Sequence, residues 1–312
     1  MVARNIRILQ LDDSLSRQKI LTRRFNPHIV NLKSFSLSCR IWMDRKSAAK
    51  ISSFLDPALK NMLTFLGSGD YHHLSSLLIE QFNLPLSVII FDHHPDWFAP
   101  PPELGCGSWV ARILKKDNIK KVILLGPSSD DISAKSIFTG VDLNFFKDDR
   151  LELYPYEHAP TKAFFKKVPD NVSFNKQGGK FYEQINWQEM RGKNLEDFLL
   201  KIIQRLPFKQ VYVSIDKDCL KSDYALTNWE EGRFSLDELL LMLKVIKKNL
   251  DIVGLDITGE YSLPQVTGIR RAIISRFDHP RAFSARNKSP ELINKVNEET
   301  NMKILELLLP NF

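Results

Sequence analysis

The sequence alternates between short apolar runs and longer segments whose apolar residues recur at helical spacing. The clearest run, residues 87–91, is rich in β-branched residues and uncharged, as expected for a strand buried on both faces. Similar runs predict strands at 5–11, 28–32, 62–66, 87–92, 121–125, 150–156, 210–215 and 251–257. Helices are predicted at 14–24, 45–55, 74–82, 109–116, 130–138, 161–167, 194–206, 235–249 and 289–309, and residues 169–192 predict a surface excursion. This alternation, without a break in composition, predicts a single α/β domain over residues 1–312 with a mostly parallel sheet.

Composition and charge bear on the partners and the cellular location of the protein. The formal net charge is +7, but the basic residues occur in scattered pairs such as Lys115–Lys116, so we interpret the charge as solvated surface and expect no nucleic-acid partner. Three cysteines without metal-type spacing indicate a reducing compartment. No apolar run reaches the length of a membrane span, and residues 1–10 lack the apolar core of a signal peptide. We therefore expect a cytoplasmic protein without a membrane partner.

Polar side chains cluster where four of the predicted strands end. In a parallel sheet the carboxyl ends of the strands share one edge, which is where ligand sites of open α/β sheets lie. The four clusters are Gly69-Asp70-Tyr71-His72-His73, Asp92-His93-His94-Pro95-Asp96, Ser214-Ile215-Asp216-Lys217-Asp218 and Asp256-Ile257-Thr258-Gly259-Glu260. If residues 92–96 stay extended, Asp92, His94 and Asp96 point to one side.

Carboxylates brought together in this way repel one another, and close like charges cannot all stay ionised. Two divalent cations surrounded by four carboxylates and two imidazoles would remove the conflict. That ligand set suits Mn²⁺ first, with Fe, Ni and Zn as alternatives. Two neighbouring metals also share a water, lower its pKa and deliver hydroxide at neutral pH. The alternative interpretation of each cluster taken alone is a polar loop that caps the following helix.

The four clusters together resemble the signatures of the ureohydrolases: arginase, agmatinase and formiminoglutamase. The family's Gly-Gly-Asp-His turn, Asp-x-His-x-Asp, Ser-x-Asp-x-Asp and late Glu correspond to residues 67–72, 92–96, 214–218 and Glu260. The resemblance covers residues 62–262 and implies a three-layer α/β/α sandwich with a parallel sheet. It also implies two manganese ions, and homo-oligomers are common in the family, although no interface is identifiable here.

The resemblance implies a role for each matching residue. One metal would be held by His72, Asp92, Asp96 and Asp216, and the other by Asp92, His94, Asp216 and Asp218. Glu260 matches the acid that grips the guanidinium of the substrate. Residues 227–232 occupy the place of the family's Gly-rich loop.

The sequence departs from the family pattern in three places. His72 and His73 compete for one ligand position, and we assign it to His72 because His-His-Leu then aligns with the family's His-Ser-Leu. Arginases carry a proton-shuttling histidine after the second signature, whereas this chain has none between His94 and His158. Residues 97–109 replace the usual substrate-binding loop, with Trp97 and Ser108 as substrate-binding candidates.

The leading hypothesis is a binuclear hydrolase that cleaves a C–N bond of a guanidino or amidine-like small molecule by metal-bound hydroxide. Asp218, Glu260 and His73 are the catalytic candidates, with Asp218 or a histidine handling the proton and Glu260 positioning the substrate. A second hypothesis is a deacetylase-like amidohydrolase with one zinc, since the tandem histidines also fit that class. A third is a non-catalytic arginase-like binding protein, suggested by the missing shuttle histidine.

Overall fold

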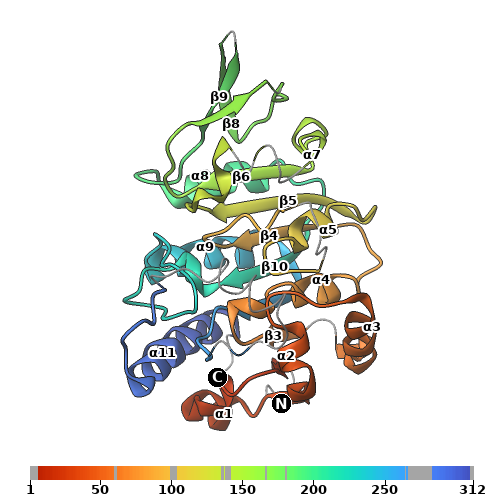
Figure 1. The fold of residues 1–312 in the computed structure, drawn as a ribbon, viewed down its shortest axis with the longest axis vertical. Helices are drawn as coiled ribbons and strands as arrows, with labels where there is room; N and C mark the ends of the chain where they lie inside the picture. Colours follow the sequence, from red (N-terminus) through yellow and green to blue (C-terminus); the bar gives the residue numbers. More distant parts are fainter. Residues whose placement is uncertain are drawn as a thin grey trace.

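The main feature of the protein is one parallel β-sheet. The computed structural model describes residues 6–59, 62–98, 104–134, 137, 142–165, 167–179, 181–263, 265 and 283–309. Its 8-stranded sheet has the order β2-β1-β3-β11-β10-β4-β5-β6, and neighbouring strands all run parallel (Figure 1). The strands are β1 (Ile6–Gln10), β2 (His28–Asn31), β3 (Leu63–Phe65), β4 (Leu86–Phe91), β5 (Ile119–Gly126), β6 (Leu151–Pro155), β10 (Gln210–Asp216) and β11 (Asp251–Thr258). Every strand predicted from the sequence lies in this sheet, which confirms the predicted α/β class.

Helices cover both faces of the sheet. The α-helices are α1 (Lys19–Phe25), α2 (Ser36–Cys39), α3 (Arg45–Phe54), α4 (Leu74–Ile79), α5 (Trp109–Ile113), α7 (Asn144–Lys147), α8 (Leu195–Ile203), α9 (Leu236–Asn249) and α11 (Pro290–Leu308). Short 3₁₀ turns are η1 (Leu15–Arg17), η2 (Lys33–Phe35), η3 (Pro57–Leu59), η4 (Gly69–Tyr71), η5 (Asp130–Ile132) and η6 (Lys217–Cys219). Among the described residues, no helix is both long and apolar enough to cross a membrane.

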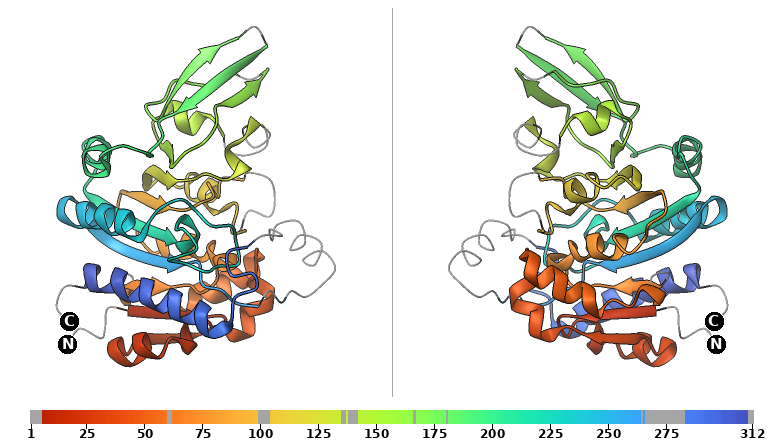
Figure 2. Two further views of the ribbon diagram at one scale, coloured as in Figure 1. Left: turned by 90° about the vertical axis from the view of Figure 1, so that its left-hand side faces the viewer. Right: turned by 90° about the vertical axis from the view of Figure 1, so that its right-hand side faces the viewer.

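The side chains of each central strand alternate between two hydrophobic cores. In β4, Val88 and Ile90 pack with α3, α4 and α5, whereas Ile89 and Phe91 pack with α1, α8, α9 and α11. Figure 2 shows α8, α9 and α11 on one side of the sheet and the orange helices on the other. Both faces of this strand are covered by helices, so its side chains are apolar on both faces, which is why residues 88–91 are continuously apolar. The result is the three-layer α/β/α sandwich that the resemblance implied.

The prediction of a helix over residues 161–167 is wrong. Residues 161–167, predicted as a helix, begin with strand β7 (Thr161–Phe164), whose residues alternate between buried and exposed. β7 pairs antiparallel with β9 (Tyr182–Trp187), which pairs with β8 (Phe174–Gly178). Strand pairing of this kind depends on a partner some twenty residues away, which a local pattern does not reveal.

The surface excursion predicted for residues 169–192 contains the strands β8 and β9 of the small sheet. The small sheet extends from the β6 end of the main sheet (Figures 1 and 2). Its buried face is anchored by Phe174 and Trp187, which pack against Phe146 of α7 with ring centroids 5.5 and 6.4 Å apart. In the predicted helix 130–138, Asp130–Ile132 form a 3₁₀ turn, and Ala134 and Ile137 are helical; residues 135, 136 and 138 lie outside the described part of the chain.

Candidate metal centre

The four polar clusters follow four strands that are neighbours in the sheet. β3, β11, β10 and β4 lie side by side in that order. Ile215 of β10 pairs with Ile257 on one side and with Phe91 on the other, so these strands end at the same level. Because parallel strands share their carboxyl edge, the segments that follow them meet there. The sheet order therefore brings together residues that are almost two hundred positions apart in sequence.

Two of these segments make the same local turn. Asp92 Oδ1 accepts a hydrogen bond from the backbone N–H of His94 at 2.7 Å, and Asp216 Oδ1 accepts one from the N–H of Asp218 at 3.0 Å. An aspartate that binds the N–H two residues ahead forms an Asx turn. Each turn leaves the second carboxylate oxygen, Oδ2, available to the site.

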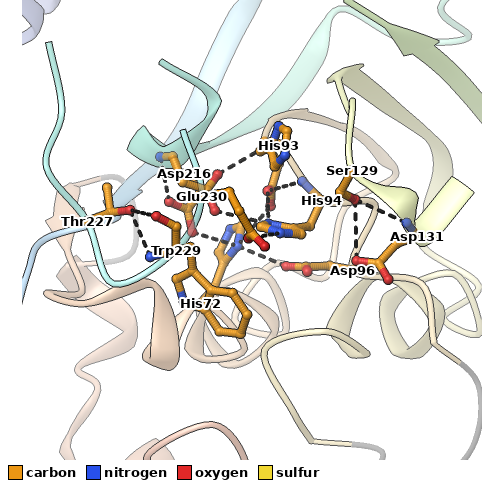
Figure 3. Close-up of polar contacts among 12 residues, drawn as sticks. His72, His93, His94, Asp96, Ser129, Asp131, Asp216, Thr227, Trp229 and Glu230 are labelled. Atoms are coloured by element: carbon orange, nitrogen blue, oxygen red, sulfur yellow. Dashed lines mark hydrogen bonds and ion pairs between the residues drawn. The ribbon is translucent and has the colours of Figure 1, made fainter. Parts of the chain in front are cut away.

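Both of these free oxygens approach one nitrogen. Nδ1 of His72 lies 3.2 Å from Asp92 Oδ2, 3.5 Å from Asp216 Oδ2 and 3.0 Å from Asp96 Oδ2 (Figure 3). Asp96 reaches this position because its backbone is left-handed, with φ of 47°. Residues 92–96 are therefore not extended throughout, but the side chains of Asp92, His94 and Asp96 all line the same cavity.

A hydrogen-bond chain orients the ring of His72. The Ser214 hydroxyl donates to Asp256 Oδ1 at 2.7 Å, and Tyr212 donates to Asp256 Oδ2 at 2.7 Å. Since its proton is directed to Asp256, the Ser214 oxygen accepts from Nε2 of His72, 2.9 Å away. In the neutral ring the proton then sits on Nε2, and Nδ1 presents its lone pair to the carboxylates. Such an outer hydrogen bond is how proteins fix the tautomer of a metal-binding histidine.

The second imidazole, His94, lies on the other side of Asp92. Its Nδ1 is 3.0 Å from Asp218 Oδ2 and 3.7 Å from Asp92 Oδ1, and its Nε2 is 3.5 Å from Glu230 Oε2. The backbone N–H of His93 donates to the other Asp218 oxygen at 3.1 Å, which links the β4 and β10 segments directly.

The resulting ligand set has two parts that share Asp92. His72, Asp92 and Asp216 form one group, and Asp92, His94 and Asp218 form another; within each group the ligand atoms lie within 4.8 Å of one another. Asp92 Oδ2 is buried and accepts no hydrogen bond from any described residue. Buried carboxylate oxygens without a donor, grouped with imidazole nitrogens, fit divalent cations such as Mn²⁺. The residues present are therefore suited to a binuclear site.

The electrostatics of the carboxylates lead to the same conclusion. Burial, reinforced by the charge of Asp92, raises the pKa of Asp96 to about 7 and the pKa of Asp218 to about 6. Burial, with the charges of Asp218 and Asp92, raises the pKa of Asp216 well above its ordinary value. Without cations, the site is too crowded for all its carboxylates to be ionised near neutral pH.

Two glycines make room for Asp216. A Cβ on Gly259 would lie 2.5 Å from Asp216 Oδ1, and the φ of Gly259 is +87°. A Cβ on Gly69 would lie 3.0 Å from Asp216 Oδ2. Gly69 follows β3, and Gly259 follows β11, the strand next to β10. Because glycine has no Cβ, the backbone at both positions can lie directly against the carboxylate of Asp216.

Comparison with known proteins identifies the fold. No protein-family model matches the sequence. An uncharacterized protein of Thermotoga maritima is 30% identical over 211 residues, which are 65% of this chain and 62% of that protein, so just under two thirds of the relative's length is matched.

Solved structures cover more of the chain. The arginase of Entamoeba histolytica, solved with L-ornithine, has a TM-score of 0.58 at 10% identity and covers 98% of this chain and 97% of its own. The arginase of Bacillus subtilis has a TM-score of 0.56 at 13% identity and covers 98% of both chains. The formiminoglutamase of Trypanosoma cruzi, solved with Mn²⁺, has a TM-score of 0.51 at 12% identity and covers 95% of this chain and 93% of its own. The chain has the arginase fold. At these identities the likeness establishes the fold alone.

Within this arginase fold, the candidate ligands line a cavity of about 640 Å³. His72, Asp92, His94, Asp96, Asp216 and Asp218 all line it, as do the predicted substrate-binding residues Trp97 and Ser108. Trp97 donates from Nε1 to the carbonyl of Asp131 at 3.2 Å, and the hydroxyl of Ser108 accepts from the N–H of Gly105 at 3.0 Å. The structure thus brings eight of the predicted site residues to one cavity.

The remaining two predicted residues lie elsewhere. His73 is buried at the start of α4 and is not among the residues that line the cavity. Glu260 is also outside it; its carboxylate contacts Lys217, Gln18 and Asn301, and it lines a separate cavity of about 190 Å³. Their predicted catalytic roles remain predictions.

The structure adds residues that sequence reasoning missed. Trp109 donates from Nε1 to Asp96 Oδ2 at 2.7 Å and packs its ring against His72, with centroids 4.8 Å apart. Trp229 packs against His94 with centroids 5.4 Å apart, and Glu230 contacts the same ring. Trp229 and Glu230 lie in the 227–232 segment, which the resemblance had matched to a functional loop, so their position was signalled although their contacts were not.

We expect Mn²⁺ affinity to rise with pH between about pH 5 and pH 8. The pKa values of Asp96 and Asp218 are raised, to about 7 and about 6. The pKa values of His72 and His94 are also held well above normal: burial alone would lower them, but the neighbouring carboxylates outweigh it. Protons therefore compete with the cation most strongly at low pH. Calorimetric titrations in buffers of different ionisation enthalpy would count the protons released; pH-independent affinity without proton release would contradict this.

Replacing Ser214 with alanine is expected to weaken Mn²⁺ binding by about 10- to 100-fold, because His72 would lose the acceptor that fixes its tautomer. Ser87 provides a matched control: it is a buried serine on the neighbouring strand β4, and its hydroxyl has no hydrogen-bond partner among the described residues. Ser87→Ala should leave the affinity unchanged. Equal affinities for the two variants in titrations with Mn²⁺ would show that the Ser214 contact does not matter.

Proposed function

We propose that this protein is a metal-dependent hydrolase that cleaves a C–N bond of a small cationic guanidino or amidine-like compound. The proposal rests on the two groups of candidate metal ligands, which share Asp92. Both groups line a cavity of about 640 Å³. In such a hydrolysis the C–N bond breaks, the oxygen of water joins the carbon, and the nitrogen leaves as an amine after gaining a proton. The chain has to hold the cations, orient the substrate and move that proton.

The candidate ligands supply oxygen and nitrogen donors of the kind that Mn²⁺ accepts, with Fe, Ni or Zn as alternatives. His72, Asp92, Asp96 and Asp216 would hold one cation, and Asp92, His94, Asp216 and Asp218 the other. When bound, a pair of neighbouring divalent cations lowers the pKa of a shared water and so provides a nucleophile at neutral pH.

The residues that line the cavity are suited to binding a cationic substrate. Carboxylates of Asp130, Asp131, Glu230 and Glu231 line it, with Arg233 as a basic member. The aromatic side chains of Trp42, Trp97, Phe98 and Trp229 line it as well. Carboxylates attract a cationic group, and aromatic faces bind one by cation–π contact. Substrate recognition by these residues would take the place of the loop that the sequence lacks.

The proton that the leaving nitrogen needs has a route through residues of the site. Asp218 and Glu230 both line the cavity, and Glu230 Oε2 lies 3.5 Å from Nε2 of His94, the ring nitrogen opposite the one that faces the other candidate ligands. The side chain of Glu230 is 46% exposed, so it connects the buried ligand set to solvent. Asp218 as the buried proton carrier and Glu230 as the outer one would replace the shuttle histidine found in arginases.

The proposal is tested by assaying the Mn²⁺-loaded protein against a panel of guanidino and amidine compounds for release of urea, ammonia or amine. We expect at least one substrate, and we expect Asp216→Asn to lower kcat/KM by at least about 100-fold, or about 2.7 kcal/mol. Asp117→Asn, an exposed aspartate in the turn before β5, should retain activity. No turnover of the whole panel by protein shown to bind Mn²⁺ would reject the substrate class, and full activity of Asp216→Asn would reject the assigned centre.

A further inference from the structure

Lys217 separates the two aspartates of the β10 segment and extends away from the cavity that they line. Its side chain is 0% exposed, and its ammonium group contacts the carboxylate of Glu260. Asp216 and Asp218 line the same cavity as the other candidate metal ligands, whereas Lys217 is not among the residues that line it. The same short 3₁₀ turn, η6, thus has candidate metal ligands on one side and a buried cation on the other.

Glu260 is held by three further elements of the fold. Its Oε1 also accepts from Asn301 Nδ2 of α11 at 2.7 Å, and its Oε2 accepts from Gln18 Nε2, at the start of α1, at 2.9 Å. Its backbone N–H donates to the carbonyl of Gly67, after β3, at 2.9 Å. The carboxylate at the end of the Lys217 side chain is therefore fixed in place by residues from both ends of the chain.

In this arrangement the carboxylate of Glu260 has no oxygen free to bind a substrate cation. Glu260 is 2% exposed and both its oxygens already accept hydrogen bonds from side chains. A guanidinium that bound Glu260 would have to displace Lys217 and leave a buried ammonium group without its partner, which is strongly unfavourable. The internal lysine occupies the place in which the family resemblance expected the substrate.

The geometry points to Lys217 and Glu260 as a positioning pair that holds the Asp216–Asp218 turn for metal binding, so that Glu260 is not a substrate ligand in this protein. The pair acts through Asp216 and Asp218, and neither Lys217 nor Glu260 is among the residues that line the larger cavity. This inference rests on the metal centre of the proposed function. It further specifies that a cationic substrate is recognised at the carboxylate and aromatic wall of the larger cavity.

The test is Mn²⁺ affinity, measured by calorimetric titration, in Lys217→Met and Glu260→Gln. Each substitution removes the ion pair and frees the turn, so we expect the dissociation constant to rise about 10- to 100-fold, as for other residues that orient metal ligands. The visible absorption spectrum of bound Co²⁺, which reports ligand geometry, should change in the same variants. Lys121→Met is the matched control: Lys121 is also buried and paired, with Glu152 at 2.7 Å, but lies in the middle of β5. It should bind Mn²⁺ like the unaltered protein.

A double variant, Lys217→Met with Glu260→Gln, separates positioning from folding. The double variant leaves no buried charge without a partner. Its unfolding temperature should therefore lie closer to that of the unaltered protein than the unfolding temperatures of the two single variants do. Its Mn²⁺ affinity should nevertheless stay weakened, because neither side chain holds the turn. Unchanged affinity and Co²⁺ spectrum in the double variant would overturn the inference. Failure of the unaltered protein to hydrolyse any guanidino compound, with these metal-binding differences present, would reject the proposed function alone.

Discussion

The structure depends on one electrostatic constraint: several carboxylates are buried together at the carboxyl edge of the central strands. Asp92, Asp96, Asp216 and Asp218 surround two imidazoles, and burial together with mutual repulsion raises the pKa values of Asp96, Asp216 and Asp218. Protons can neutralise such a group only in part, whereas divalent cations neutralise it and use its oxygens as ligands. The rest of the site can be understood as the means of keeping these groups together.

The fold meets this constraint with rigid elements. The ends of three strands, β3, β10 and β4, deliver the ligands, and β11, which lies between β3 and β10, adds Asp256. Two Asx turns fix one oxygen of Asp92 and of Asp216, and the Ser214–Asp256 contact fixes the ring of His72. Behind the β10 turn, the Lys217–Glu260 pair connects the centre to α1 and α11. Precision at a metal site comes from such supporting contacts as much as from the ligands themselves.

Much of this could be predicted from the sequence, because the information is local. Apolar β-branched runs identified all eight strands of the main sheet, and polar residues immediately after them identified the ligands. The contacts of Ser214 and Glu260 could not be predicted in this way, since they depend on which strands are neighbours and on residues such as Gln18 and Asn301 at opposite ends of the chain. The strand β7 was mistaken for a helix for the same reason: its structure is set by pairing with β9.

The central claim is that the buried carboxylates and imidazoles hold two cations that share Asp92. The most direct test is elemental analysis of the number of metal ions per chain, on protein purified without chelators and then loaded with manganese. We expect about two Mn²⁺ ions per chain. One firmly bound zinc would favour a deacetylase-like centre instead, and protein that retains no metal would contradict the account.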